Sequence, residues 1–477
     1  MSDPSLLPLE IFDQILRSIQ YNHFDAEKKP YRCLEHFAQQ SKQLFACSLV
    51  NRRWHRHSNP HLYARFSFDL GGNSSQKLWH FLRTVLEIPE YAAHVRTFHY
   101  QDQWIHEKEI PKIANMFSKA DLTLVLNGFR SAGLQNGETE LIAQHRHVHR
   151  SEYLNLIMAN LPNLTMLKAG ALKLSKHHAL FEASEKQAFR TLRDVTFGRV
   201  ETIWRSASIC AEHLIPFFQL PTLRKMTIFY AYSDPQSTHS DALETHASTS
   251  PVTDLTLVYS RYHLLCLADA RALLQLPKSL KSLSLNVKAE TFNFENPSPG
   301  PDDIVTLPDF GDILMQHSDC LEYLDLFWEA SSLQDVSSPK DPLGVLQKFT
   351  RLKTLYIDIH LIMGLELGEQ RHVDWPVCLN ETLPPTLESL VLYGLYDYWN
   401  YQDIEPFLTD LVQSPRHHEL RSIMIEEFSE GRKCSLDSTN TAALKQICAD
   451  KGVTFQIVKC NQLPQGGARR TDEPADL

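Results

Sequence analysis

A short apolar pattern recurs along most of this 477-residue chain and constrains its fold more than any other feature. In each copy, apolar residues occupy the first, fourth and sixth of six consecutive positions. The copies begin at Leu164, Leu192, Leu223, Val252, Leu280, Leu321, Leu352, Leu387 and Leu420, with a plausible earlier copy at Val95 and a weak last copy at Gly452. The eight steps from 164 to 420 average 32 residues. Alternation at the end of each copy predicts a strand, and a steady period of this length predicts stacked structural repeats.

Helix-like stretches precede several of the copies, at residues 153–161, 211–220 and 264–276, and each ends in Leu-Pro. Strand and helix repeated at a steady period predict an α/β solenoid over residues 90–460. The alternation resembles leucine-rich repeats, and this resemblance implies a curved parallel sheet on the concave face with helices outside. A doubly wound α/β domain has the same alternation. The near-equal steps and the absence of a Gly-rich phosphate loop favour the solenoid.

The longest steps contain polar segments that predict exposed insertions. Residues 233–251 are rich in Ser, Thr and His, residues 295–303 contain three prolines, and residues 331–342 are rich in Ser and Pro. Clusters of these residue types punctuate regular structure. The polar segment 461–477 is predicted to be a disordered tail.

Composition narrows the classes of function. Charged residues make up 22% of the chain and its formal net charge is −10, which disfavours nucleic acid and anionic membranes as partners. The nine cysteines are widely spaced and form no CxxC pair, as expected for reduced thiols in the cytoplasm or nucleus. The start shows no secretory signal, and no apolar run is long enough to span a bilayer.

No catalytic or cofactor motif is visible. The sequence lacks a nucleotide-binding loop, a GxSxG elbow and an HExxH helix, so we expect no catalytic residue, no cofactor and no enzyme activity. His145 and His149 have a spacing that could hold zinc on one helix face. Because Arg146 and Arg150 flank them, a solvated helix face is the better interpretation. No metal site is predicted.

The N-terminus carries two amphipathic helical stretches. Residues 7–19 begin with Pro8 and Glu10, which suit a first helical turn. They then place apolar residues on one face at Ile11, Phe12, Ile15, Leu16 and Ile19. The second stretch runs from Leu44 to Trp54, and Pro60 is expected to stop it.

Together these stretches resemble an F-box over residues 5–68. The matching motifs are Leu7-Pro8-Leu9-Glu10-Ile11, Ile15-Leu16-Arg17-Ser18-Ile19 and Val50-Asn51-Arg52-Arg53-Trp54. Residues 20–43 exceed the family's usual spacing and are expected to loop out as an insert between the first two helices. An ordinary helical hairpin that caps the solenoid is the alternative. The repeats resemble degenerate leucine-rich repeats, since the family's turn asparagine is mostly missing. The long inserts are similar to those of F-box proteins of filamentous fungi.

The resemblance implies a substrate-recognition subunit of a Skp–cullin–F-box E3 ubiquitin ligase. The F-box would bind the Skp adaptor, and through it cullin, while the repeats would hold a target protein. The adaptor-facing positions would be Leu7, Pro8, Ile11, Ile15, Leu16, Ile19, Val50 and Trp54. A leucine-rich-repeat scaffold acting outside any ligase is the alternative, and an enzyme within the inserts is a third possibility.

Strand alternation and the distribution of aromatic residues predict where the target binds. Leu283, Leu324, Leu355 and Leu390 are expected in the core, with Ser284, Asp325, Tyr356 and Val391 on the concave side. Aromatic residues that are exposed in a cluster are typical of binding surfaces. The predicted target residues, with Trp328 and Trp399 as anchors, are Phe327, Trp328, Tyr356, Tyr393, Tyr396, Tyr398 and Trp399. Alternatively, some of these rings cap the solenoid core.

Overall fold

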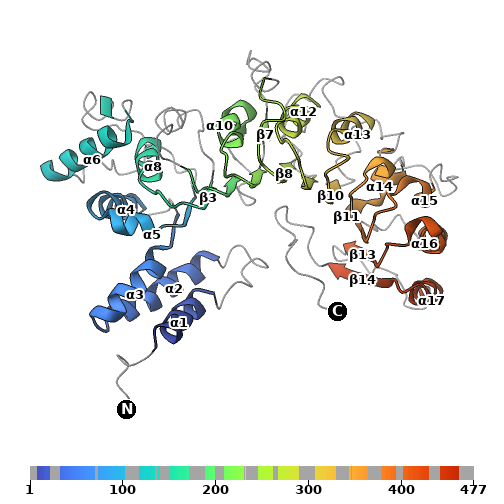
Figure 1. Cartoon of the computed structure of the whole chain (residues 1–477), viewed down its shortest axis with the longest axis horizontal. Coiled ribbons are helices and arrows are strands. Elements are labelled where there is room, and N and C mark those ends of the chain that lie inside the picture. The colour runs from blue at the N-terminus through green and yellow to red at the C-terminus, as the bar shows by residue number, and fades with distance from the viewer. Residues whose placement is uncertain are drawn as a thin grey trace, which may run out of the picture. The chain divides into compact units, whose positions relative to one another are not determined.

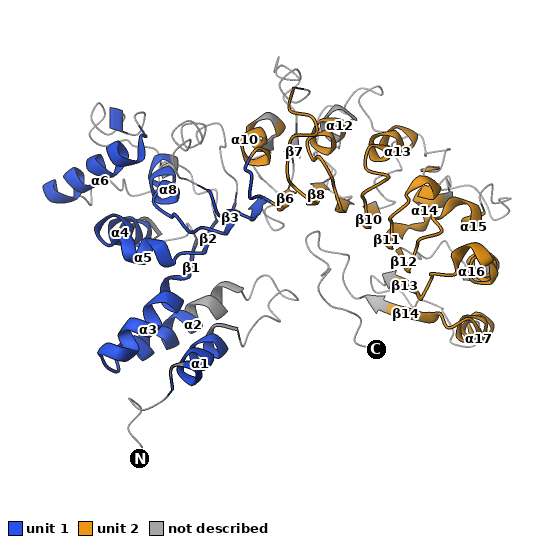
Figure 2. Cartoon of the chain, viewed as in Figure 1, with its two compact units in different colours: residues 1–197, 220–223 blue, residues 198–219, 224–477 orange. Residues whose placement is uncertain are grey.

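The protein is described from a computed structural model, in which the elements are numbered along the chain (Figure 1). The structure describes residues 8–21, 33–69, 74–101, 118–134, 138–139, 150–170, 189–198, 209–229, 231–232, 245–260, 267–288, 307–328, 343–344, 346–363, 378–393, 401–428 and 441–460. The chain divides into two compact units (Figure 2). Unit 1 comprises residues 1–197 and 220–223, and unit 2 comprises residues 198–219 and 224–477.

Unit 1 begins with three helices, α1 (Leu9–Tyr21), α2 (Cys33–Ser48) and α3 (Arg52–Tyr63). The first turn of α1 follows Pro8, whose carbonyl accepts a hydrogen bond from the Phe12 amide at 3.1 Å. Asn51 caps α3 by accepting from the Trp54 amide at 3.0 Å. A cap of this kind stabilises a helix by about 1 kcal/mol. The first predicted stretch is therefore helical, whereas the second, from Leu44 to Trp54, is divided between the end of α2 and the start of α3 by residues 49–51.

Two local expectations for this region are wrong. Residues 33–43 belong to α2 and do not loop out, so the connection between α1 and α2 is confined to residues 22–32, which lie outside the described residues. Pro60 does not stop α3, which continues to Tyr63. A proline in a helix removes one backbone donor, and the packing of this helix against its neighbours outweighs that loss over the final turn.

The sheet of unit 1 contains parallel strands in chain order: β1 (Arg65–Asp69), β2 (Thr97–Gln101), β3 (Met166–Ala169) and β4 (Asp194–Phe197). The first strand starts at Arg65, before the predicted solenoid boundary at residue 90. Tyr63, Phe66 and Phe68 have the spacing of the repeat, so the sequence contained this signal. The accompanying helices are α4 (Ser74–Glu87), α5 (Pro89–His94), α6 (Lys119–Ala132) and α8 (Arg150–Ala159).

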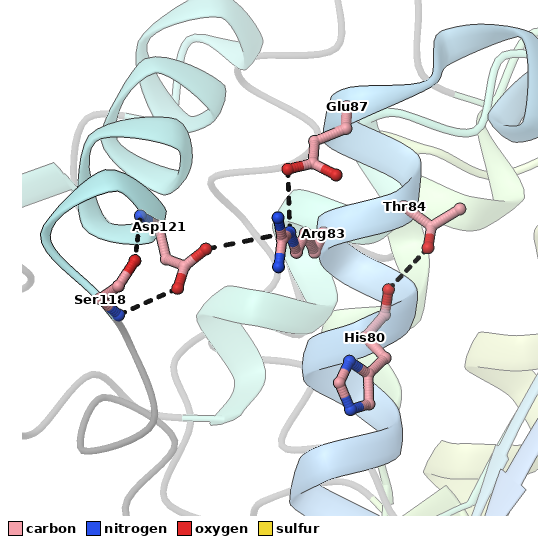
Figure 3. Close-up of polar contacts among 6 residues, drawn as sticks. All are labelled: His80, Arg83, Thr84, Glu87, Ser118 and Asp121. Carbon is pink, nitrogen blue, oxygen red and sulfur yellow. Dashed lines mark hydrogen bonds and ion pairs between the residues drawn. The ribbon is translucent and has the colours of Figure 1, made fainter.

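A capping box begins α6 and faces α4 (Figure 3). The Ser118 hydroxyl accepts from the Asp121 amide at 3.2 Å, and the Asp121 carboxylate accepts from the Ser118 amide at 2.9 Å. These hydrogen bonds hold the pKa of Asp121 below its usual value. On α4, Arg83 donates to Glu87 at 2.8 Å and lies 3.9 Å from Asp121. The start of α6 is thus tied to α4 within unit 1.

The sheet of unit 2 has the same topology, with parallel strands paired in chain order. Its strands are β6 (Lys225–Phe229), β8 (Asp254–Ser260), β9 (Ser282–Lys288), β10 (Tyr323–Trp328), β11 (Thr354–Asp358), β12 (Ser389–Tyr393), β13 (Ser422–Phe428) and β14 (Thr454–Cys460). A separate pair joins β5 (Ile209–Cys210) to β7 (Ala231–Tyr232). This is the predicted repeat solenoid, because every copy of the pattern within these ranges falls on a strand.

Helices lie along one face of this sheet, on the outer side of its curve (Figure 2). They are η7 (Ala211–Leu214), α10 (Ile215–Phe218), α12 (Leu267–Gln275), α13 (Leu307–Met315), η10 (Leu346–Lys348), α14 (Ile359–Met363), α15 (Leu379–Thr382), α16 (Tyr401–Gln413), η11 (Pro415–His417) and α17 (Ala442–Asp450). The side chains that alternate away from these helices therefore line the concave face.

The predicted register is confirmed. Leu283, Leu324, Leu355 and Leu390 are each 0% exposed and stand opposite one another in consecutive strands. The next residues along these strands, from Ser284 to Val391, form the adjacent aligned row on the opposite face. A shift by one residue would exchange the two faces.

Threonine hydroxyls connect neighbouring repeats just before the strands begin. The Thr191 hydroxyl donates to the Leu164 carbonyl at 2.8 Å, and the Thr386 hydroxyl donates to the Leu352 carbonyl at 2.9 Å. In each pair, one repeat holds the carbonyl of the first apolar residue of the preceding repeat. These bonds satisfy buried backbone acceptors where the sheet ladder has not yet begun.

Two buried histidines make similar bonds between repeats. Nε2 of His317 donates to the Leu274 carbonyl at 2.8 Å, and Nε2 of His417 donates to the Asn380 carbonyl at 3.0 Å. Burial lowers the pKa of both imidazoles, and the carbonyl contacts partly offset this effect. Both rings are therefore held neutral near pH 7.

Leu355→Ala should lower the free energy of unfolding by about 2–5 kcal/mol, because it removes a fully buried side chain. Thr354→Ala, at the preceding and half-buried position, should cost less than about 1 kcal/mol. Urea denaturation followed by circular dichroism would measure both changes. Equal losses for the two variants would contradict the register.

The histidines predict a loss of stability in mild acid. Their folded pKa lies below the ordinary value of about 6.5, so the unfolded chain takes up protons first as the pH falls. The contribution of these two histidines to stability should therefore be complete well above pH 6.5 and be lost progressively as the pH falls through that value. His317→Gln should reduce the drop in melting temperature between pH 7.5 and 5.5. His418 is the exposed neighbour of His417 in the sequence, so His418→Gln should retain the full drop in melting temperature. Identical pH profiles for all three proteins would contradict this assignment.

Candidate interaction surfaces

Exposed apolar side chains concentrate on α1, on α2 and in the turn between α2 and α3. Ile11 is 42% exposed, Phe45 and Val50 are each 55% exposed, and Leu49 is 68% exposed. We call these four residues the N-terminal apolar set. Elsewhere in the described ranges, only Ile88 and Val458 among large apolar residues reach comparable exposure. Solvent-exposed apolar groups of this size are typical of surfaces that bind a partner.

The local core explains why these side chains remain outside. Phe12, Leu16 and Leu44 form a small buried cluster, against which Trp54 packs. The Phe12 and Trp54 rings meet edge to face with centroids 4.4 Å apart. Adjacent residues of a helix point in different directions, so Ile11 and Phe45 cannot enter the core that Phe12 and Leu44 fill.

The predicted adaptor-facing residues differ in how far their side chains are exposed to solvent. Pro8, Ile11 and Val50 are exposed, whereas Leu16 is only 1% exposed and belongs to the core. Half-buried positions are held by Ile15, Ile19 and Trp54. Leu7 lies outside the described residues. Phe45 and Leu49 were missing from the predicted set, although two adjacent apolar residues at 44 and 45 indicate that one of them faces outward.

Basic side chains accompany this apolar set. Arg52 and Arg56 are exposed on α3, which begins directly after Val50. On α1, the Asp13 carboxylate lies 2.8 Å from Arg17 and 3.1 Å from His61. Arg52 and Arg56 thus add exposed positive charge close in sequence to Val50.

An aromatic row crosses the concave face of unit 2. The rings of Tyr323 and Tyr356 have centroids 5.6 Å apart, and those of Tyr356 and Tyr393 are 6.0 Å apart. Phe327 meets Tyr393 edge to face at 5.5 Å. Phe327, Tyr393 and Val391 form a buried cluster, against which Tyr356 packs.

A carboxylate lies within this row. Asp325, which is 8% exposed, accepts hydrogen bonds from the Tyr393 hydroxyl at 2.7 Å and from the Ser284 hydroxyl at 3.0 Å. Asp325 is on β10, Tyr393 on β12 and Ser284 on β9, so the two hydrogen bonds connect different repeats. Hydrogen bonds to a buried charge are stronger than neutral ones.

The structure places the predicted target residues in three groups. Phe327 and Tyr393 are each 1% exposed, in agreement with the alternative that some rings pack in a core. Tyr356 is half-buried and reaches the surface. Trp328 is the last residue of β10, but its side chain is outside the described part of the structure, as are the whole residues Tyr396, Tyr398 and Trp399. Their role in target binding stays a prediction.

The described residues hold neither a metal-ligand cluster nor a membrane-spanning helix. Within these ranges, no group of three His, Cys, Asp or Glu side chains is arranged to hold a metal ion. Among the described helices, none combines the length and the apolar character needed to cross a bilayer. His145 and His149 lie outside the described residues.

The fold and surfaces define a class of protein, an α/β solenoid suited to protein interaction. The sequence model described as "Leucine-rich repeat domain" matches residues 185–462, more than half of the chain. The chain belongs to this leucine-rich repeat family. The match does not include α1–α3, and no F-box is detected there. No curated protein matches the chain.

The bond between Tyr393 and Asp325 should stabilise unit 2. Tyr393→Phe removes the hydroxyl that the buried carboxylate accepts from, at an expected cost of about 1.5–3 kcal/mol in the free energy of unfolding. A double-mutant cycle with Asp325→Asn, measured by urea denaturation, should give a coupling energy of about 1–2 kcal/mol. Strictly additive losses would show that the two groups do not interact.

Proposed function

We propose that the protein is the target-recognition subunit of a Skp–cullin–F-box ubiquitin ligase. In this proposal α1–α3 bind the Skp-type adaptor, and the leucine-rich repeats bind a target protein. Transfer of ubiquitin is carried out by other subunits, so the chain itself contributes no catalytic residue.

The observation that carries this proposal is the N-terminal apolar set. Four large apolar side chains remain exposed on a helical unit that already has its own core. Two of them, Ile11 and Val50, belong to the sequence motifs that resemble an F-box. Exposure of this kind is unfavourable for an isolated chain and becomes favourable when a partner covers it, at about 1.5–3 kcal/mol for each side chain.

The charges beside the apolar set support the same partner. Arg52 and Arg56 are exposed at the start of α3, close in sequence to Val50. Basic residues at the edge of an apolar interface accelerate association with an acidic protein and fix its orientation. The family-level function of the repeats is protein binding, which fits the second half of the proposal.

Ile11→Ser combined with Val50→Ser should weaken binding of a purified Skp-type adaptor by about 100-fold or more. Loss of two buried side chains accounts for at least about 3 kcal/mol, and each 1.4 kcal/mol is tenfold in Kd. Isothermal titration calorimetry on the full chain would measure the change. Since both side chains are exposed, the melting temperature should stay within a few degrees of the wild-type value.

Ile88→Ser provides a matched control. Ile88 is a similarly exposed apolar residue of unit 1 that lies outside α1–α3, so its substitution should leave adaptor binding unchanged. Failure of the wild-type chain to bind the adaptor, or equal binding by the double variant, would overturn the ligase role. The helices would then be a cap of the solenoid, and the protein a repeat scaffold outside any ligase.

A further inference from the structure

Charged residues of alternating sign lie side by side where five strands of unit 2 begin. The residues immediately before β9–β13, which we call the charge ladder, are Lys281, Glu322, Lys353, Glu388 and Arg421. The backbone amide of each member donates to the carbonyl of the member before it at 2.8–2.9 Å. These hydrogen bonds fix the order of the charges along this edge of the sheet.

The first four members of the ladder form two ion pairs. Lys281 lies 3.8 Å from the Glu322 carboxylate, and Lys353 lies 2.9 Å from the Glu388 carboxylate. The hydrogen bond from Lys353 to Glu388 and the charge of Glu388 raise the pKa of Lys353, with smaller contributions from Glu322 and Glu419. The two lysines therefore neutralise the carboxylates of the ladder.

Arg421 is the member that is left over. In the register of β13 and β14, the residue beside it on the other side is Val453, which carries no charge. A second guanidinium belongs to Arg351, two residues before Lys353. Both arginines are exposed, and within the described part of the structure neither side chain forms an ion pair. Two guanidiniums on this edge are thus available to a ligand.

An open cleft of about 570 Å³ lies along the same edge. Among the described residues, its charged lining consists of Glu322, Arg351, Lys353, Glu388, Glu419 and Arg421. This volume is in the range of ligand sites, but most such sites have an apolar lining. Together with Lys281, which pairs with Glu322, the lining has four cations and three carboxylates. The excess of one positive charge favours an anionic ligand.

We propose that this cleft binds an acidic segment of the target protein, with Asp or Glu carboxylates of that segment paired to Arg421 and Arg351. The inference deepens the proposed function by naming the chemistry of the target, and it rests on that function for the segment being part of a ligase target. The ladder and the cleft belong to unit 2 itself.

The residue types in the cleft favour a carboxylate as the bound group. Arginine presents a planar fork of donors that binds a carboxylate through two parallel hydrogen bonds. The arginines are also the cations of the cleft without an internal ion pair. A phosphate group would suit the same guanidiniums, but its second negative charge is repelled by the three carboxylates in the lining. A singly charged Asp or Glu side chain therefore fits better than phosphoserine.

The extent of the cleft favours a peptide over a free anion. Its lining comes from the segments before four neighbouring strands, β10–β13. Strands about 4.8 Å apart place these four segments across about 14 Å, the length of roughly four extended residues. Thr350, which is exposed in the lining, adds a hydroxyl group that can donate to or accept from a peptide backbone.

The test uses the full chain and four fluorescent peptides. Each peptide carries glutamate, glutamine, lysine or phosphoserine at two positions three residues apart among serines, because Arg351 and Arg421 precede strands about 10 Å apart. Fluorescence polarisation should show the glutamate peptide binding at least tenfold more tightly than the glutamine and lysine peptides, and more tightly than the phosphoserine peptide. The formal net charge of the chain is −10, so its overall field favours the lysine peptide. A preference for glutamate must then come from a local site.

Substitution of the two arginines should reduce this binding. Arg421→Gln and Arg351→Gln should each weaken binding of the glutamate peptide by about three- to fivefold, as expected for exposed ion pairs, and the double variant by about tenfold or more. Raising the salt concentration should weaken the binding of the wild-type chain as well.

Arg271→Gln is the matched control. It removes the same charge from the same unit, but at an exposed position on α12, and should leave the affinity for the glutamate peptide unchanged. All three arginines are exposed, so each variant should keep a melting temperature close to the wild-type value. A change in peptide affinity is then separate from a change in stability.

Three results would overturn the inference: a glutamine or lysine peptide that binds as tightly as the glutamate peptide, glutamate-peptide binding that the double variant leaves unaffected, or tighter binding of the phosphoserine peptide. Adaptor binding measured on the same preparations separates this inference from the proposed function. Adaptor bound without selectivity for the glutamate peptide would overturn the acidic-segment site alone. Glutamate-peptide selectivity without adaptor binding would overturn the ligase role and leave the acidic-segment site in place.

Discussion

Parallel pairing of strands in one continuous register is the constraint on which unit 2 depends. Each repeat places its central apolar residue, such as Leu324 or Leu355, directly opposite the same residue of its neighbour, and all are fully buried. Backbone hydrogen bonds fix the spacing between repeats, while burial of each leucine contributes about 1.5–3 kcal/mol. Both the hydrogen bonds and the burial need neighbouring repeats, because a single repeat has no partner to cover its apolar face.

This arrangement separates the tasks of the two faces. The leucines are buried between the sheet and the helices. Long insertions between repeats leave the strand register unchanged. The concave side carries carboxylates and aromatic rings, with Asp325 held by Tyr393 and Ser284. These hydrogen bonds connect β9, β10 and β12 across the concave face.

The N-terminal helices α1–α3 are stabilised by a separate core of their own. Their core is small and centres on Phe12, Leu16 and Leu44, so other apolar side chains of these helices are not covered by it. Phe45 and Leu49 remain exposed as a result. A self-sufficient cap would be expected to hide such residues. Their exposure is the observation from which we propose that a partner covers this unit.

Periodicity in the sequence by itself determined the strands, their register and the burial of residues such as Leu283 and Leu390, because alternation and repeat length are local properties. The sequence also contained the first strand, in the spacing of Phe66 and Phe68, although the boundary was expected at residue 90. Only the tertiary structure decided that residues 33–43 are helical, that Leu16 is core while Phe45 is surface, and that Phe327 and Tyr393 are buried. Those outcomes depend on which neighbours compete for the same space, and distant neighbours are not encoded in any local pattern.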